Sequence, residues 1–192
     1  MKENIWNVPN ILTLSRLPLA MVLFLAISTE HWSIALGVFL LASLTDWLDG
    51  WWARRYQQLS AFGRTFDPLI DKVLVGGAFI YLLPVAAAGL SRWMVAVVIC
   101  REILITGIRG HLESLGKKFG ADWFGKLKML LQCAYIIALL VVLTTREWQL
   151  PTEMIDVLDE IRRIVLWLML AATIGSGVQY VWKAYLLWRQ DD

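Results

Sequence analysis

The stretch that decides the fold of this chain reads DWLDGWWARR at residues 46–55 and continues with DPLID at residues 67–71. The two aspartates of the first segment are three positions apart and those of the second are four apart, so each pair lies on one face of a helix. Because a short interval separates the segments, the two pairs can face each other across an antiparallel pair of helices. The four residues are Asp46, Asp49, Asp67 and Asp71.

The sequence around these aspartates is typical of a membrane protein. Of 192 residues, 58% are hydrophobic and 18% are charged, and the mean hydropathy is +0.59. This composition excludes a disordered chain and argues against a soluble globular domain. Segments of about 20 mostly apolar residues can cross a bilayer. They predict one all-α integral membrane domain over residues 1–192, with six transmembrane helices at about 8–29, 31–56, 65–89, 91–112, 121–145 and 160–187.

Two local features refine these spans. A proline is tolerated in the first turn of a helix, so the third span should begin shortly before Pro68. The acidic segment 146–163 predicts a short amphipathic helix at the outer surface, ahead of the last span.

The distribution of Lys and Arg orients the spans. With both termini in the cytoplasm, only four of the 18 basic residues fall on the outer side, namely Arg92, Arg146, Arg162 and Arg163. The pattern predicts a multi-pass protein of the inner (cytoplasmic) membrane, with the aspartates at the cytoplasmic face.

Four carboxylates in such helices need compensation. Each costs about 2.5–3.5 kcal/mol at the centre of an inserted helix, so we expect them to face the bundle interior or an aqueous cavity. Two carboxylates about 4 Å apart repel by on the order of 4 kcal/mol at an effective dielectric of 20, so the group either takes up protons or shares cations. Carboxylates without His or thiolate ligands suit Mg²⁺, Mn²⁺ or Ca²⁺, and four of them can hold two ions.

The residues beside the aspartates leave room for a ligand. Gly50 and Ala53 leave the helix surface next to Asp49 uncovered, and Gly63 permits a close approach in the following loop. Arg54 adds a cation. Small residues also let membrane helices pack closely, and it is the aspartate spacing that favours a ligand site here.

The whole pattern resembles the signature of the CDP-alcohol phosphotransferases, D-x2-D-G-x2-A-R-x8-G-x3-D-x3-D. All eight specified positions are present: Asp46, Asp49, Gly50, Ala53, Arg54, Gly63, Asp67 and Asp71. The resemblance implies the six-helix membrane bundle of that family and a homodimer. It also implies transfer of a phosphatidyl or similar group from a CDP-linked donor to an alcohol, with release of CMP.

The resemblance further implies a role for each residue of the motif. Two Mg²⁺ or Mn²⁺ ions would be bound by Asp46, Asp49, Asp67 and Asp71, and Asp71 would also be the catalytic base. The cytidine diphosphate would be bound by Asp49, Gly50, Ala53, Arg54 and Gly63.

Basic residues on later spans bear on the acceptor alcohol. A cation in the middle of a span is costly unless it is paired. Because Glu102 should point to another side of the helix, we expect its neighbour Arg101 to pair with an aspartate or a bound anion. A pocket for an acceptor phosphate is predicted at Arg101, Arg109 and Lys126, whereas Lys117, Lys118 and Lys128 are typical of positive-inside topology.

Three short runs resemble the phosphatidylglycerophosphate synthase branch of the family. They are PNILTLSR at 9–16, REILITGIR at 101–109 and GKLK at 125–128, where Met129 follows in place of the usual Thr. The implied donor and acceptor are CDP-diacylglycerol and sn-glycerol 3-phosphate, giving phosphatidylglycerol phosphate and CMP in phospholipid biosynthesis. Membrane lipid is a further expected partner, and no nucleic acid is expected.

Three other interpretations stay open. A sister enzyme could use serine, inositol phosphate or phosphatidylglycerol as the acceptor on the same metal site. Carboxylates inside a membrane also mark ion paths, as in a divalent-cation transporter, although the outer halves of the second and third spans carry no acidic residue. The third is a structural protein with a degenerate site, although no aspartate of the motif is missing.

Overall fold

The computed structural model describes residues 8–56, 61–115 and 123–189. Within these ranges the chain forms α-helices and one short 3-10 helix, without any strand, which confirms the prediction of an all-α protein. The elements are α1 (Val8–Ser28), α2 (Trp32–Arg55), α3 (Ala61–Leu82), η1 (Ala86–Ala88), α4 (Arg92–Ser114), α5 (Trp123–Glu147) and α6 (Thr152–Arg189).

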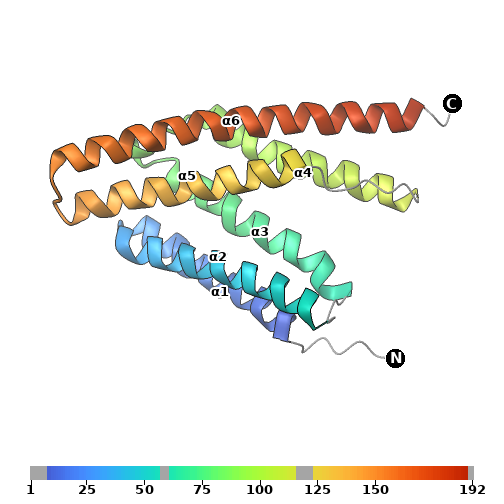
Figure 1. The fold of residues 1–192 in the computed structure, drawn as a ribbon, viewed down its shortest axis with the longest axis horizontal. Coiled ribbons are helices and arrows are strands. Elements are labelled where there is room, and N and C mark those ends of the chain that lie inside the picture. The colour runs from blue at the N-terminus through green and yellow to red at the C-terminus, as the bar shows by residue number, and fades with distance from the viewer. Residues whose placement is uncertain (1–7, 57–60, 116–122, 190–192) are drawn as a thin grey trace.

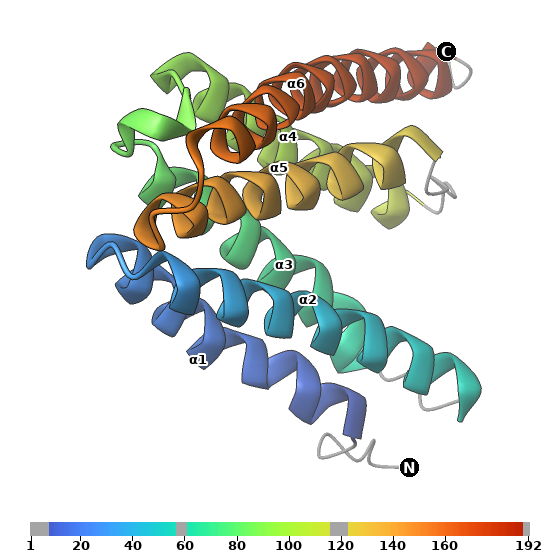
Figure 2. The ribbon, with the colours of Figure 1, turned by 60° about the vertical axis from the view of Figure 1, so that its left-hand side comes forward.

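The helices form two groups joined through α3 and α5. Helix α1 packs on α2 and α3, α5 packs on α6 and α2, and α4 packs mainly on α6. Figure 1 shows α1 and α2 on one side of the molecule and α4 and α6 on the other, and Figure 2 shows α1 and α2 diverging from α5 and α6. Helix α1 begins and α6 ends on the side where the two groups are farthest apart (Figure 1).

Four helices in the described part of the chain are long and apolar enough to cross a membrane. They cover Asn10–Ser28, Trp32–Trp52, Trp123–Glu147 and Thr152–Leu187. Helices α3 and α4 carry more charge in their middle portions, including Asp71 and Lys72 in α3 and Arg101 and Glu102 in α4. The crossing of the bilayer by all six helices therefore stays a prediction.

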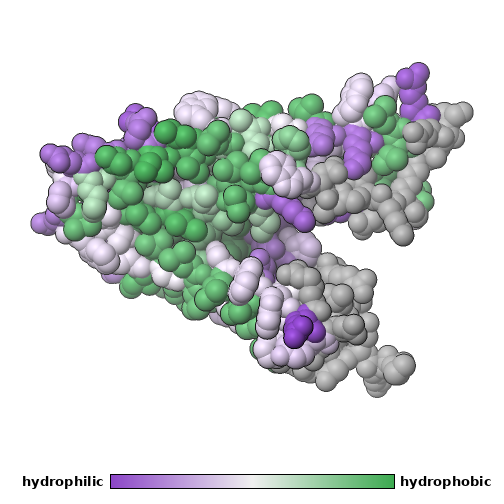
Figure 3. Space-filling model, in the orientation of Figure 1, coloured by the Kyte–Doolittle hydropathy of each residue, from purple (hydrophilic) through white to green (hydrophobic). Residues whose placement is uncertain are grey.

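The outer surface of the helices is rich in exposed apolar side chains. Met21, Leu25, Ile34, Leu44 and Val178 are each at least half exposed. Figure 3 shows that hydrophobic residues cover the middle of this face, while hydrophilic residues gather toward its ends. A surface of this kind suits contact with lipid tails rather than with water.

Two predictions about helix ends are wrong. Helix α3 begins at Ala61, so Pro68 lies inside the helix rather than in its first turn. The missing N–H of Pro68 costs one helical hydrogen bond with the residue four positions before it, and the rest of the helix continues past this position. The acidic segment before the last span is not a separate amphipathic helix, because α6 runs without a break from Thr152 to Arg189.

The core is built from small and large side chains of all six described α-helices. Ala20 of α1, Ala42 of α2 and Ala78 of α3 are almost completely buried, and small residues of this kind let helix backbones approach closely. Phe79 of α3 stacks on Tyr135 of α5 with ring centroids 5.7 Å apart. This contact joins the two helix groups at the centre of the molecule.

One carbonyl oxygen, that of Ala88, links the connection between α3 and α4 to α5 and α6. The Ala88 carbonyl accepts hydrogen bonds from the Tyr135 hydroxyl, at 2.8 Å, and from the Arg162 guanidinium. The Nε of Arg162 also donates to Asp159 at 2.8 Å. Gly89 has a φ of 67°, and a Cβ atom there would lie 3.1 Å from Arg162 Nη1, so both the backbone and the close approach favour glycine.

The substitution Arg162→Met tests this connection. It leaves Ala88 with one donor and Asp159 without its Nε partner, so we expect a loss of about 1–3 kcal/mol of stability, measured as a lower apparent melting temperature in detergent. Arg163→Met is the matched control, because the Arg163 side chain is exposed and pairs at the surface with Glu160. Equal losses in the two variants would contradict the assigned role of Arg162.

Candidate active site

The four aspartates of the motif converge on one side chain, the guanidinium of Arg16. Asp46 Oδ1 lies 2.6 Å from Arg16 Nη1, and Asp71 Oδ1 also contacts Nη1. Asp49 Oδ2 lies 2.8 Å and Asp67 Oδ1 lies 3.5 Å from Arg16 Nη2. The sequence-based prediction that the two pairs face each other across α2 and α3 is therefore confirmed, and we call the four residues the aspartate quartet.

The quartet lies inside the bundle, toward the side where α1 begins. A helix rises about 1.5 Å per residue. Arg16 lies eight residues from the start of α1, Asp46 nine residues before the end of α2, and Asp71 ten residues from the start of α3. These positions place the charged groups roughly 12–15 Å from the respective helix ends. Figure 3 shows a recess on that side of the molecule with hydrophilic residues at its depth.

Helix α1 presents Arg16 because its buried face changes character along its length. Asn10, Thr13 and Arg16 follow one another at intervals of three residues, and all three are buried. The same face continues with Ala20 and Leu23, which belong to the hydrophobic core. The polar first half of this face meets the quartet, and the apolar second half packs the bundle.

Thr13 completes the polar contacts of the quartet. Its hydroxyl lies 3.4 Å from Asp49 Oδ2 and donates to Asp67 Oδ1. The carboxylates of the two helices are thus held by two side chains of α1, one cationic and one neutral. Asp49 is the most enclosed of the four, whereas the side chains of Asp46 and Asp67 are about two-fifths exposed.

The charge of the quartet exceeds that of its partner. Four ionised carboxylates against one guanidinium leave a net charge of −3, and each close carboxylate pair repels by on the order of 4 kcal/mol at an effective dielectric of 20. In the described ranges no three Asp, Glu, His or Cys side chains close on a common metal position, because the quartet oxygens close on the guanidinium. The donor set, four carboxylates open to solvent on one side, fits a hard divalent cation.

The predicted CDP-binding residues lie next to the quartet along the chain. Gly50 follows Asp49 in α2 and is half-buried. Ala53 and Arg54 belong to the last turn of α2, but their side chains lie outside the described part of the structure. Gly63 belongs to the first turn of α3, not to a loop as expected, and its surroundings are also outside that part.

A second polar group, which we call the basic cluster, consists of Lys72, Arg101, Arg109 and Lys128, together with the one carboxylate of Glu102. Glu102 Oε1 accepts hydrogen bonds from Arg101 Nη1, at 3.0 Å, and from Lys128 Nζ. Lys72 donates to the Thr106 hydroxyl on α4. Because Lys72 directly follows Asp71, the basic cluster adjoins the aspartate quartet.

Tyr180 of α6 contacts both arginines of the basic cluster, Arg101 and Arg109 of α4. The guanidinium carbons of Arg101 and Arg109 lie 5.5 Å and 5.9 Å from the centre of its ring, within the range of cation–π attraction. Arg109 Nη2 also lies 3.4 Å from the Tyr180 hydroxyl, and Arg101 Nη2 donates to Ser176 at 3.1 Å. Both arginines are therefore positioned by α6.

The expectation for the pairing of Arg101 is wrong. Arg101 pairs with its neighbour Glu102, because its long side chain reaches back along the helix even though the two Cβ atoms point in different directions. Lys128, which the sequence assigned to the positive-inside pattern, is buried against Glu102. Lys126 is exposed, and its predicted contact with an acceptor phosphate is not decided by its position.

Arg16 and Thr13 are the site residues that sequence reasoning missed. Both residues entered the sequence-based prediction through the run PNILTLSR at 9–16, and Arg16 also through the basic-residue distribution, but neither was assigned to the site, although the spacing of Asn10, Thr13 and Arg16 places all three on one helix face. The signal that could have identified them is this polar face in an otherwise apolar helix.

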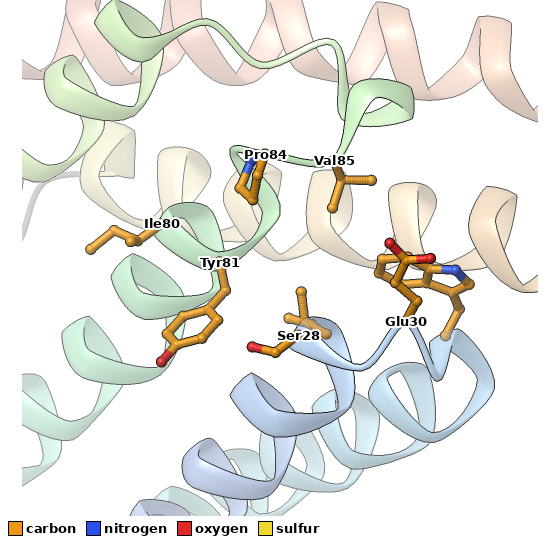
Figure 4. A pocket seen from close by; sticks show the side chains of 8 residues that line it. Ser28, Glu30, Ile80, Tyr81, Pro84 and Val85 are labelled. Atoms are coloured by element: carbon orange, nitrogen blue, oxygen red, sulfur yellow. The ribbon is translucent and has the colours of Figure 1, made fainter.

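A pocket at the opposite end of the bundle is separate from the site. It has a volume of about 450 Å³ and is lined by the end of α1, the α1–α2 turn and the end of α3 (Figure 4). Its lining includes the polar residues Ser28, Glu30 and Tyr81. It lacks the converging charges of the quartet.

Comparisons with known proteins point to one family. The family model of the CDP-alcohol phosphatidyltransferases matches residues 6–175. A protein of Bacillus subtilis (strain 168) is 34% identical over 194 residues, covering 93% of this chain and 95% of its own length. A protein of Rickettsia typhi is 31% identical, covering 91% and 94%. A protein of Escherichia coli (strain K12) is 35% identical, covering 70% and 77%.

All three relatives carry the name CDP-diacylglycerol–glycerol-3-phosphate 3-phosphatidyltransferase. The family match spans both the aspartate quartet and the basic cluster. This chain belongs to the CDP-alcohol phosphatidyltransferase family.

Proposed function

We propose that this protein transfers the phosphatidyl group of CDP-diacylglycerol to sn-glycerol 3-phosphate, releasing CMP and forming phosphatidylglycerol phosphate for phospholipid biosynthesis. The observation that carries the proposal is the convergence of the aspartate quartet from two helices on one point. The names of the relatives and the basic cluster beside the quartet support the choice of donor and acceptor.

The quartet would hold the divalent cations that the family uses. Asp46, Asp49 and Asp67 are the proposed ligands, with Asp71 completing the set, and two Mg²⁺ or Mn²⁺ ions are the expected occupants. A bound divalent cation supplies positive charge that neutralises the diphosphate of the donor and makes CMP a better leaving group. Gly50, Ala53, Arg54 and Gly63 are proposed to line the place of the cytidine diphosphate, together with Asp49.

Asp71 is the proposed base. Its side chain is 20% exposed and lies at the border between the quartet and the basic cluster. In the proposed reaction the acceptor hydroxyl oxygen forms a bond to the β-phosphorus of the donor, and the hydroxyl proton passes to Asp71. The bond between that phosphorus and the CMP oxygen breaks, and CMP leaves with the electron pair.

The basic cluster is the proposed place for the phosphate of the acceptor. Arg101 and Arg109 are held by Tyr180 and Ser176, so their guanidinium groups are positioned before a ligand arrives. Lys126 is the third proposed contact and lies two residues before the buried Lys128. One arginine can donate two parallel hydrogen bonds to the oxygens of a phosphate, which suits the recognition of a phosphorylated alcohol.

The membrane arrangement is part of the same proposal. We propose that all six helices cross the inner membrane, that both termini are cytoplasmic and that the quartet opens toward the cytoplasm. This placement lets the diacyl tails of the donor stay in lipid while the nucleotide meets water. The homodimer implied by the family resemblance, and the absence of a nucleic-acid partner, stay predictions.

A sister enzyme with another acceptor is the second candidate, and the basic cluster argues against it when the acceptor lacks a phosphate. Purified protein supplied with CDP-diacylglycerol should release CMP with sn-glycerol 3-phosphate and much less with serine, inositol phosphate or phosphatidylglycerol. Measuring CMP release with each alcohol decides the acceptor. Equal or greater release with another alcohol would replace the proposed one.

Chelation tests the metal requirement. We expect EDTA to abolish CMP release and an excess of Mg²⁺ or Mn²⁺ to restore it, because the net charge of the quartet cannot accommodate a diphosphate without added cations. The control is addition of a matched excess of Na⁺ at constant ionic strength. Full activity in the presence of chelator would remove the metal site from the mechanism.

The two lysines near the start of α5 form a matched pair. Lys126→Met should raise the KM for glycerol 3-phosphate by about tenfold, the effect of losing one charged contact, with a smaller effect on the KM for CDP-diacylglycerol. Lys128→Met should lower the melting temperature instead, because it leaves Glu102 with one partner fewer in a buried site. If Lys128→Met raised the KM and Lys126→Met lowered the melting temperature, the roles assigned to the two lysines would be reversed.

A further inference from the structure

We infer that Arg16 is a built-in counter-cation of the aspartate quartet and that a divalent cation must displace it, so that Arg16 sets the metal affinity of the site. The inference rests on the proposed function in that it takes the quartet to be the metal site. It concerns a residue outside the aspartate motif, on a different helix.

The contacts of Arg16 divide between its two terminal nitrogens. Nη1 contacts Asp46 and Asp71, and Nη2 contacts Asp49 and Asp67. Each nitrogen therefore joins one carboxylate of α2 to one of α3. The guanidinium uses a carboxylate oxygen from every member of the quartet, and these oxygens are the ones that a cation between α2 and α3 would need.

Arg16 cannot leave this position by losing its proton. Its side chain is completely buried, and a guanidinium stays charged in proteins. Its Nε is also buried and finds no hydrogen-bond acceptor among the described residues. A cation that binds the carboxylate oxygens therefore leaves the Arg16 guanidinium buried, charged and without its anionic partners. The free energy lost in this way lowers the apparent affinity of the site for the cation.

The displaced guanidinium needs an anion, and the diphosphate of a nucleotide supplies one. Guanidinium groups pair with phosphate oxygens through two parallel hydrogen bonds. Metal and nucleotide should therefore bind cooperatively in the wild-type protein, since the nucleotide gives Arg16 the partner that the metal has removed. Without Arg16 this part of the cooperativity disappears.

The variant Arg16→Met tests the inference without turnover. Mn²⁺ binding is measured on the purified protein in detergent, by the electron paramagnetic resonance of free Mn²⁺, with and without CDP. We expect Arg16→Met to bind Mn²⁺ more tightly than the wild type by about tenfold or more in the absence of CDP. The tightening of Mn²⁺ binding by CDP should be smaller in Arg16→Met than in the wild type.

Lys72→Met is the matched control, because it removes one positive charge beside Asp71 while its ammonium group donates to Thr106 rather than to the quartet. It should change Mn²⁺ affinity by less than about threefold, the effect of a partly screened charge. If Arg16→Met does not fold, Arg16→Gln, which removes the positive charge but keeps a hydrogen-bond donor, should still bind Mn²⁺ more tightly than the wild type. Unchanged or weaker Mn²⁺ binding in the folded Arg16 variants would overturn the inference.

The outcome separates this inference from the proposed function. Wild-type protein that binds Mn²⁺ and releases CMP, with an unaltered affinity in the Arg16 variants, would overturn the role of Arg16 and leave the phosphatidyltransferase in place. Wild-type protein that shows neither Mn²⁺ binding nor metal-dependent CMP release would overturn both.

Discussion

Arg16 lies completely buried in an apolar bundle, and its guanidinium cannot shed its charge. A buried charge of this kind is tolerated only when opposite charges surround it. Asp46 and Asp49 come from α2, and Asp67 and Asp71 come from α3, so this requirement holds α1, α2 and α3 in one register. A shift of α2 or α3 by a single turn, about 5.4 Å, would leave the guanidinium without half of its partners. The contacts between Arg16 and the four aspartates therefore determine both the packing of the first three helices and the geometry of the site.

The quartet has more negative charge than Arg16 can balance, and the neighbouring basic cluster has the opposite excess. It has four cations, Lys72, Arg101, Arg109 and Lys128, and one carboxylate, Glu102, which pairs with Arg101 and Lys128. Asp71 and Lys72 are consecutive residues at the border between the two groups. An acidic region for cations and a basic region for anions thus adjoin inside one bundle. This is the arrangement that a reaction between a nucleotide diphosphate and a phosphorylated alcohol needs, and neither group would be stable in the bundle unless its charges were compensated.

Local sequence rules worked where one helix decides the outcome and failed where a neighbour does. The spacing of the aspartates predicted correctly that the two pairs would face each other. The position of Pro68 predicted a helix start that the structure does not have, because a proline can lie inside a helix at the cost of one hydrogen bond. Arg101 was expected to avoid Glu102 on the basis of Cβ directions, but Ser176 and Tyr180 of α6 hold its side chain so that both contacts form.

The sequence by itself determined that the chain is a bundle of apolar helices with four carboxylates on two facing surfaces. It could do so because helical periodicity and the cost of charge in an apolar environment act within each segment. Only the tertiary structure decided that Arg16 and Thr13 of α1 hold those carboxylates, and that Lys128 lies buried against Glu102 while Lys126 is exposed. The physical reason is that these partners are far apart in the chain, so the packing of the helices decides which charged side chains meet.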